Sequence, residues 1–253
     1  MSEALHLVKV PLRAEKLAAI ARQQSLPLRN LDDGYLCHRV LRKMWADEAP
    51  APFVLRGQGR DLHVWGYSRV DAVALADRAR VYGDPSLLGA LGDLEMLVSK
   101  PMPTLEAGRR VGFLLRACPV VRLARGATGH HRPGAEVDAF LARCFHVDAD
   151  TAVSREDVYR EWLLARLNRS DTTGVSVDTI RVASFARERV VRRTQGETRV
   201  ARTLERPDVR FEGTLTIVDG TRFTQWLAHG VGRHRAFGFG ALILVPPGTQ
   251  HAS

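Results

Sequence analysis

Apolar and polar positions in the first hundred residues follow two different periods. Alternation every two residues predicts short strands, whereas apolar positions that recur every three to four residues predict helices. A glycine-containing run at 57–61 separates two of the strands and predicts a hairpin. The predicted elements are a strand at 5–12, a helix at 32–45, strands at 53–56 and 63–67, a helix at 70–81 and a strand at 96–102.

The remainder of the chain repeats this order, with one additional helix. Its predicted elements are a strand at 109–122, helices at 136–145 and 155–167, strands at 175–193 and 209–218, a helix at 221–229 and a strand at 241–245. Both parts therefore have the order β-α-β-β-α-β, which is typical of the ferredoxin-like unit. We expect an α+β fold of two tandem ferredoxin-like (RRM-like) domains, covering residues 1–104 and 108–253.

The helix predicted at 32–45 separates its apolar side chains from its polar ones. Leu36, Cys37, Val40, Leu41, Met44 and Trp45 share one side, and Tyr35, His38, Arg39, Arg42 and Lys43 share the other. We therefore expect His38 to face outward among three cations, which lower the pKa of a histidine and keep it neutral and able to act as a base. The alternative is an ordinary solvated helix face.

A glycine-rich loop is predicted at 230–240. Its glycines are Gly230, Gly232, Gly238 and Gly240, and its basic residues are Arg233, His234 and Arg235. A dinucleotide-binding loop is excluded because an arginine occupies the place of the third glycine and the loop follows a helix. Glycine lets a backbone approach a phosphate closely, so the loop predicts a cradle for a phosphate backbone. The alternative is a glycine turn with solvated charges.

The charge balance indicates an anionic partner. The chain has 37 Lys+Arg against 28 Asp+Glu, a net charge of +9, and only four of the basic residues are lysines. Guanidinium groups bind phosphate oxygens in pairs, so RNA is a suitable partner. A basic hairpin is predicted around 181–210, and we expect its arginines to follow the backbone of an RNA stem: Arg181, Arg187, Arg189, Arg192 and Arg193. A solvated hairpin is the alternative.

Cysteine and histidine spacing predicts no disulfide framework, metal site or cofactor. The three cysteines, Cys37, Cys118 and Cys144, form no CxxC pair, and His130, His131 and His146 lack the paired spacing of a metal site. No apolar run approaches the ~18 residues that cross a membrane. We expect a cytoplasmic protein without a membrane segment.

Three motifs together resemble the CasE family, the CRISPR RNA-processing endoribonucleases of type I-E Cascade systems. They are the glycine-rich loop with the Ala236-Phe237-Gly238-Phe239-Gly240-Ala241-Leu242 run, the segment Phe113–Pro119 and the segment Tyr35–Arg39. The resemblance extends in order over nearly the whole chain. It implies a metal-independent ribonuclease that cuts the repeat hairpin of precursor CRISPR RNA and remains on the mature crRNA 3′ handle as a Cascade subunit. We expect it to be monomeric on its own.

The resemblance also assigns residues. His38 matches the catalytic histidine of the family, Tyr35 the tyrosine three positions before it and Lys43 the lysine five positions after it. The four loop glycines match the family's loop. Cys118 stands where the family commonly has an asparagine before proline, so an asparagine-specific contact is not expected here.

RNA cleavage without a metal requires a proton to leave the 2′-hydroxyl, charge stabilisation at phosphorus and a proton for the leaving 5′-oxygen. We assign the acid/base role to His38, charge stabilisation to Lys43 or a loop cation, and nucleophile orientation or a share in proton transfer to Tyr35. The expected products carry a 2′,3′-cyclic phosphate and a 5′-hydroxyl. The RNA-binding residues expected besides the hairpin arginines are Arg39, Arg42, Gly230, Gly232, Arg233, His234, Arg235, Gly238 and Gly240.

Two other functions fit parts of the pattern. A non-cleaving subunit that binds the RNA hairpin would use the same fold and basic strip with His38 idle. A nuclease that uses a metal is disfavoured because the chain lacks a paired ligand spacing or acid cluster. Base stacking on an RRM-type sheet is also disfavoured, because aromatic residues make up 7% of the chain and no RNP1-like run is present.

Overall fold

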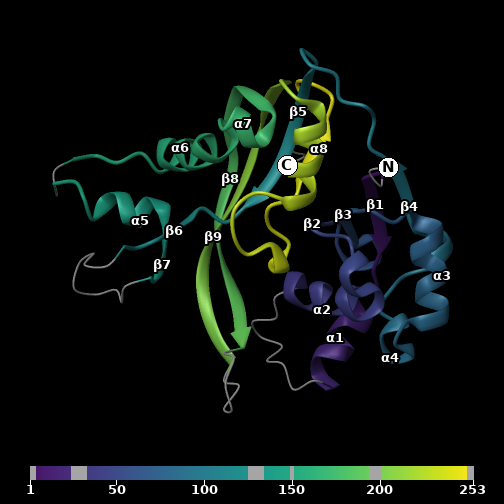
Figure 1. Cartoon of the computed structure of the whole chain (residues 1–253). Helices are drawn as coiled ribbons and strands as arrows, with labels where there is room; N and C mark the ends of the chain where they lie inside the picture. Colours follow the sequence, from purple (N-terminus) through teal and green to yellow (C-terminus); the bar gives the residue numbers. More distant parts are fainter. Residues whose placement is uncertain (1–3, 24–32, 125–133, 149–150, 194–200, 250–253) are drawn as a thin grey trace.

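Two antiparallel four-stranded sheets follow one another along the chain (Figure 1). The structure is a computed structural model that describes residues 4–23, 33–124, 134–148, 151–193 and 201–249. The first sheet has the order β2-β3-β1-β4 and the second the order β10-β5-β9-β8. The strands are β1 (His6–Pro11), β2 (Phe53–Arg56), β3 (His63–Ser68), β4 (Val98–Pro101), β5 (Arg110–Ala117), β8 (Val175–Arg193), β9 (Ala201–Ile217) and β10 (Leu242–Val245).

Each sheet places its first strand between its third and its last. This shared order is the ferredoxin-like arrangement, so the predicted α+β fold with two ferredoxin-like units in tandem is confirmed. The long strand predicted at 175–193 is confirmed as β8, whereas β9 begins eight residues before the predicted strand at 209–218. Among the described helices, none is long and apolar enough to span a membrane.

Helices cover one face of the first sheet: α1 (Ala14–Gln23), α2 (Asp33–Trp45), α3 (Ala72–Tyr82) and α4 (Pro85–Leu88), with short 3-10 turns η2 (Ala46–Glu48), η3 (Gly59–Asp61) and η4 (Leu94–Met96). Strand alternation explains the packing: Val8 and Val10 are fully buried under these helices, whereas Lys9 between them is only half-buried. All six apolar residues of the α2 stripe are buried, so the predicted two-sided helix is confirmed. Helix α1 was not predicted.

The second sheet is covered mainly by α6 (Arg155–Leu167) and α8 (Gly220–His229), with short helices α5 (Ala139–Cys144) and α7 (Ser170–Thr173). A separate two-stranded sheet joins β6 (Val120–Arg122) to β7 (Glu136–Asp138). The single strand predicted at 109–122 is wrong in part, because it breaks at Pro119, which lacks a backbone N–H group.

The helix predicted at 136–145 is also wrong in part, since residues 136–138 form β7. Helix α5 starts after Asp138, whose side chain accepts a hydrogen bond from Phe140 N at 2.8 Å. The pair His130-His131, whose spacing predicts no metal site, lies outside the described residues.

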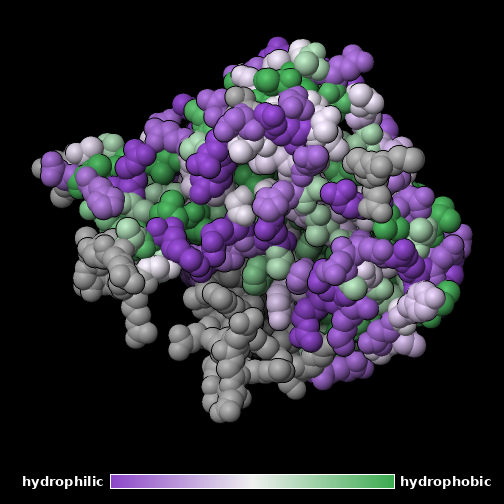
Figure 2. All heavy atoms as spheres, viewed as in Figure 1, coloured by the Kyte–Doolittle hydropathy of each residue, from purple (hydrophilic) through white to green (hydrophobic). Residues whose placement is uncertain are grey.

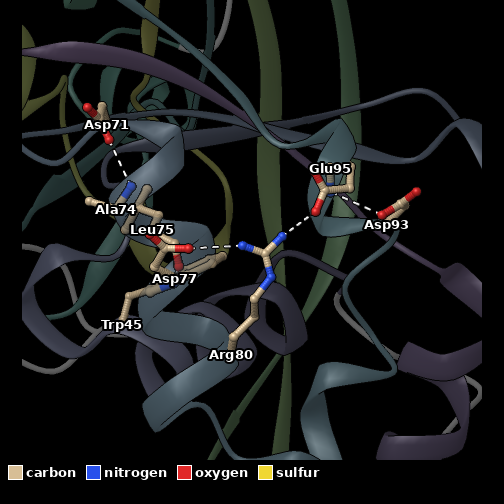
Figure 3. A network of polar contacts seen from close by, with 8 residues as sticks. All are labelled: Trp45, Asp71, Ala74, Leu75, Asp77, Arg80, Asp93 and Glu95. Carbon is tan, nitrogen blue, oxygen red and sulfur yellow. Dashed lines mark hydrogen bonds and ion pairs between the residues drawn. The ribbon is translucent and has the colours of Figure 1, made fainter.

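Side-chain contacts fix the orientation of α2. Trp45 Nε1, at the end of this helix, donates to the carbonyl oxygen of Leu75 in α3 at 2.7 Å (Figure 3). Arg80 of α3 in turn binds Asp77 of its own helix and Glu95 of η4. Helix α2 is thus held by α3, and α3 is in turn held by η4.

The two sheets meet at their edge strands, β2 and β10. Val54 of β2 packs against Ala241 and Ile243. Tyr67 Oη of β3 donates to the carbonyl oxygen of Leu242 at 2.6 Å. This junction brings the loop that precedes β10 close to α2 under the first sheet.

Candidate functional site

The outward face of α2 carries Tyr35, His38 and Arg42 on successive turns, because residues three and four apart in a helix share a face. In the space-filling view the surface over α2 is mainly hydrophilic (Figure 2). His38 is half-buried, and burial together with the positive charge of Arg42 lowers its pKa below the usual 6.5. At neutral pH the imidazole is therefore uncharged and able to accept a proton.

Lys43 and Arg39 lie differently. Five residues along a helix turn through about 140° beyond one full turn, so Lys43 and His38 lie at opposite edges of the polar side of α2. Lys43 Nζ lies 3.7 Å from a carboxylate oxygen of Asp84, the N-cap residue of α4. The guanidinium carbon of Arg39 lies 6.0 Å from the ring centroid of Tyr35. Among the three predicted cations, Arg42 is thus the one whose charge acts on His38.

The glycine-rich loop at 230–240 packs on α2 through its short turn η5 (Arg235–Phe237). The ring of Phe237 stacks on that of Tyr35, with centroids 5.6 Å apart and an angle of 23° between the planes. Gly238 has φ +78°, and a Cβ there would lie 3.6 Å from Nη1 of Arg116. Gly240 has φ +86°, and a Cβ would come within 2.5 Å of the carbonyl oxygen of Val231, so only glycine fits.

The basic side chains of this loop bind the protein itself. His234 Nε2 lies 3.0 Å from Glu136 in β7, and Arg233 forms an ion pair with the same carboxylate. Arg206 of β9 approaches it to 3.4 Å. Burial and Arg206 lower the pKa of His234, although Glu136 opposes them. Arg235 donates to the carbonyl oxygen of the last residue of α8. These contacts hold the loop in place over α2.

The basic hairpin is formed by β8 and β9, and it extends beyond the rest of the second sheet (Figure 1). Arg187 is exposed and pairs in register with Pro207. Arg181 forms an ion pair with Glu212, whose side chain is buried. Three further arginines occupy backbone positions toward the tip, with Arg189 opposite Glu205, Arg192 opposite Arg202 and Arg193 opposite Ala201.

The comparisons with known proteins decide the family. A family model described as CRISPR associated protein matches residues 5–246. The chain belongs to this family. A comparison with curated proteins found no match.

Solved structures share the fold of this CRISPR-associated protein. A structure described as CRISPR endoribonuclease Cse3 bound to 19 nt RNA is 23% identical, covers 96% of this chain and 100% of its own, and has a TM-score of 0.62. Thermus thermophilus Cse3 bound to an RNA representing a pre-cleavage complex is 22% identical, with 96% and 100% coverage and a TM-score of 0.57. A chain of a CRISPR RNA-guided surveillance complex is 16% identical, with 95% and 99% coverage and a TM-score of 0.52.

The contacts of Arg116 near the site were not predicted from the sequence. Arg116 forms two hydrogen bonds to Asp208, of 3.0 and 3.1 Å, and lies 4.4 Å from the ring centroid of Phe239 in the glycine-rich loop. Its charge also lowers the pKa of Asp33 at the start of α2, against the larger effect of burial, which raises it. The charged position in the otherwise apolar run Phe113–Pro119 was the available signal.

Glu136 was not predicted as part of the site either, because it is an isolated acid far in sequence from the loop it holds.

Cys37 and Cys118 are buried, and burial raises the pKa of the Cys118 thiol to about 12. Within the described ranges no group of three or more His, Cys, Asp or Glu side chains is arranged to hold a metal ion.

Proposed function

We propose that this protein is an endoribonuclease that binds and cleaves the repeat stem-loop of precursor CRISPR RNA. The observation that carries the proposal is the half-buried, uncharged His38, with Tyr35 one turn before it and stacked under the glycine-rich loop. Solved proteins of the same fold are described as endoribonucleases bound to RNA, which is consistent with this function.

In the proposed reaction, neutral His38 accepts the proton of the 2′-hydroxyl. The 2′-oxygen attacks the adjacent phosphorus in line, the O2′–P bond forms and the P–O5′ bond breaks. The leaving 5′-oxygen takes up the proton that His38 has accepted, directly or through Tyr35, which leaves a 2′,3′-cyclic phosphate and a 5′-hydroxyl. A positioned base contributes ~10²–10⁴-fold, so alignment and charge stabilisation must supply the rest. Tyr35 orients the 2′-hydroxyl or shares the proton transfer, and no metal or cofactor takes part.

Lys43 is proposed to stabilise the negative charge at phosphorus. Its side chain is 52% exposed and its contact with Asp84 is a surface ion pair. Such pairs contribute about 0–1 kcal/mol, so an RNA phosphate can displace the carboxylate at little cost. Arg39 and Arg42 are proposed to hold phosphates beside the reacting group.

We propose that the loop and the hairpin bind the RNA backbone. The loop's glycines allow close approach of RNA, and the hairpin arginines follow the stem. The cleaved RNA remains bound through its 3′ handle while the protein joins the other Cascade subunits. A chain of the same fold in a CRISPR RNA-guided surveillance complex supports this assembly. The proposed division into domains 1–104 and 108–253 falls between β4 and β5.

The test is incubation of the purified protein with its cognate repeat RNA in EDTA, followed by analysis of both product ends. Wild type is expected to cut once and to leave a cyclic phosphate, whereas His38→Ala binds the RNA but cleaves at least ~10²-fold more slowly. His63→Ala removes a half-buried histidine of β3 and serves as the matched control that retains cleavage. Tight binding without any cleavage by wild type would identify a non-cleaving RNA-hairpin-binding subunit instead.

A further inference from the structure

A hollow of about 420 Å³ lies between the start of the glycine-rich loop and residues of α6, α7 and α8. Helix α7 packs beside α8 there, at the upper end of the second sheet (Figure 1). The hollow is lined by Arg166, Arg169, Thr172, Trp226, Gly230 and Gly232. None of its side chains takes part in the proposed cleavage reaction.

Two arginines bring uncompensated positive charge to this hollow. Arg166 is half-buried, lies 3.8 Å from the ring centroid of Trp162 and donates from Nη1 to the Trp162 carbonyl oxygen at 2.7 Å. Burial and the charge of Arg169 lower the pKa of Arg166 to about 10. Neither guanidinium is within ion-pair distance of a carboxylate in the described part of the chain. Two like charges at a hollow without an acid favour an anion there.

The available donors indicate which anion fits. The hydroxyl groups of Thr172 and Thr173 both donate to the carbonyl oxygen of Arg169, at 3.0 and 2.9 Å. Their protons are therefore already used, and recognition falls to the guanidinium N–H groups. Arg166 has five N–H donors in a planar fork, of which the bond to Trp162 uses one. This geometry suits the paired oxygens of a phosphate.

Trp226 adds an aromatic surface to the same hollow. It is half-buried and stacks with Phe223 at 6.1 Å between ring centroids, which limits its movement. Cations beside an aromatic ring are the combination that proteins use for unpaired nucleotides, because every base has a π face that can stack.

The hollow is joined to the α2 face by the glycine-rich loop. Gly232 has φ +72°, and a Cβ there would lie 3.0 Å from the ring of Trp162, the residue on which Arg166 stacks. Five residues later, Phe237 stacks on Tyr35. Five residues span at most about 18 Å, so one RNA strand at His38 can reach the hollow within a few nucleotides.

We propose that this hollow binds an unpaired nucleotide of the RNA strand that flanks the cleaved hairpin, with its phosphate on Arg166 and Arg169 and its base against Trp226. The proposal rests on the proposed function, since it assigns a second contact for the same RNA. It concerns the flanking strand alone, whereas the basic hairpin is proposed to bind the stem.

The test measures RNA affinity in the His38→Ala background, so that no substrate is consumed. Three RNAs are compared: the repeat hairpin alone, and the same hairpin with about eight unpaired nucleotides on its 5′ or on its 3′ side. Arg169→Ala removes an exposed side chain and leaves Arg166 stacked, so the fold is retained, and thermal unfolding verifies this. Arg69→Ala removes one positive charge at an exposed position between β3 and α3 and is the matched control.

Arg169→Ala is expected to weaken binding of one flanked RNA about tenfold and to reduce the slope of log K against log salt by about 0.7, the value for one contact to a single strand. Binding of the bare hairpin changes less than about twofold, and Arg69→Ala has no such selectivity. Equal weakening of the bare and flanked hairpins, or no weakening, would overturn the proposal. The proposal would also be overturned if inorganic phosphate stabilised wild type but not Arg169→Ala while the RNA affinity of the two stayed equal. The hollow would then be a site for free anions. If instead wild type neither binds nor cuts the bare hairpin, the proposed function itself fails.

Discussion

The ring of Phe237 stacks on the ring of Tyr35 with 5.6 Å between centroids. Phe237 belongs to the loop that precedes the last strand of the second sheet, and Tyr35 belongs to the helix that carries His38 under the first. This contact joins the two halves of the chain at the proposed site of cleavage. The loop therefore positions a side chain of α2.

Phe237→Ala should slow cleavage about tenfold or more while RNA affinity changes little. Loss of the stack, worth about 0.5–1.5 kcal/mol, frees the Tyr35 ring, and a misplacement of about 1 Å can cost ~10²-fold in rate. Single-turnover cleavage with saturating protein measures this. Phe237→Tyr keeps the ring and is the matched control, expected near the wild-type rate. A wild-type rate for Phe237→Ala would mean that the stack plays no part.

The pH dependence of cleavage should report the environment of His38. A base must be neutral, so the rate rises with pH through the pKa of His38, and this acidic limb lies below pH 6.5 because burial and Arg42 lower that pKa. Arg42→Ala removes the second cause and should move the limb toward higher pH. Lys43→Ala should lower the plateau and leave the limb in place. A limb that Arg42→Ala does not move would contradict the assignment of this titration to His38.

Glu136 should contribute strongly to stability, since three basic side chains surround it. Its side chain and that of Arg206 are 11% and 9% exposed, so Glu136→Gln leaves a buried guanidinium without its charge partner. We expect a loss of about 1.5–3 kcal/mol in the free energy of unfolding, measured by urea denaturation. Glu161→Gln breaks the exposed pair with Arg143 and should cost less than about 1 kcal/mol. Equal effects of the two variants would contradict the role given to Glu136.

The hairpin should contribute affinity that depends on salt. Arg187→Ala removes one exposed charge and should reduce the slope of log K against log salt by about 0.9, the value for one contact to a duplex. Arg181→Ala is a contrasting case, because Arg181 is paired with Glu212 and its loss should reduce stability as well. Titration of the repeat hairpin at several salt concentrations measures both slopes. An unchanged slope for Arg187→Ala would place the stem elsewhere.

The order of helices and strands along the chain was predicted well because the strongest elements have a clear period. The long run at 175–193 and the two-sided helix at 33–45 are examples of strong periodic signals. Helix α1 was missed although Leu17, Ile20 and Ala21 have helical spacing, because the buried stripe of this ten-residue helix is only three residues long. The break at Pro119 was visible in the sequence, but the apolar residues on both sides favoured one continuous strand.

The candidate site was predictable only as far as it lies on one element. Tyr35, His38 and Arg42 share a helix face, so spacing alone places them together. The clamp of Arg206, Arg233 and His234 on Glu136 joins residues as far as 98 positions apart, and local patterns carry no information about such contacts. For the same reason the ion pair between Lys43 and Asp84 could not be anticipated.

The most direct test of the central claim is single-turnover cleavage, in EDTA, of a repeat RNA with one 2′-deoxy nucleotide at the scissile position. The account predicts wild-type affinity for this RNA and no detectable cleavage, because the attacking 2′-oxygen is absent. The unmodified RNA in the same reaction is expected to be cut. Cleavage of the deoxy substrate would contradict attack by the 2′-hydroxyl and with it the role of His38 as its base.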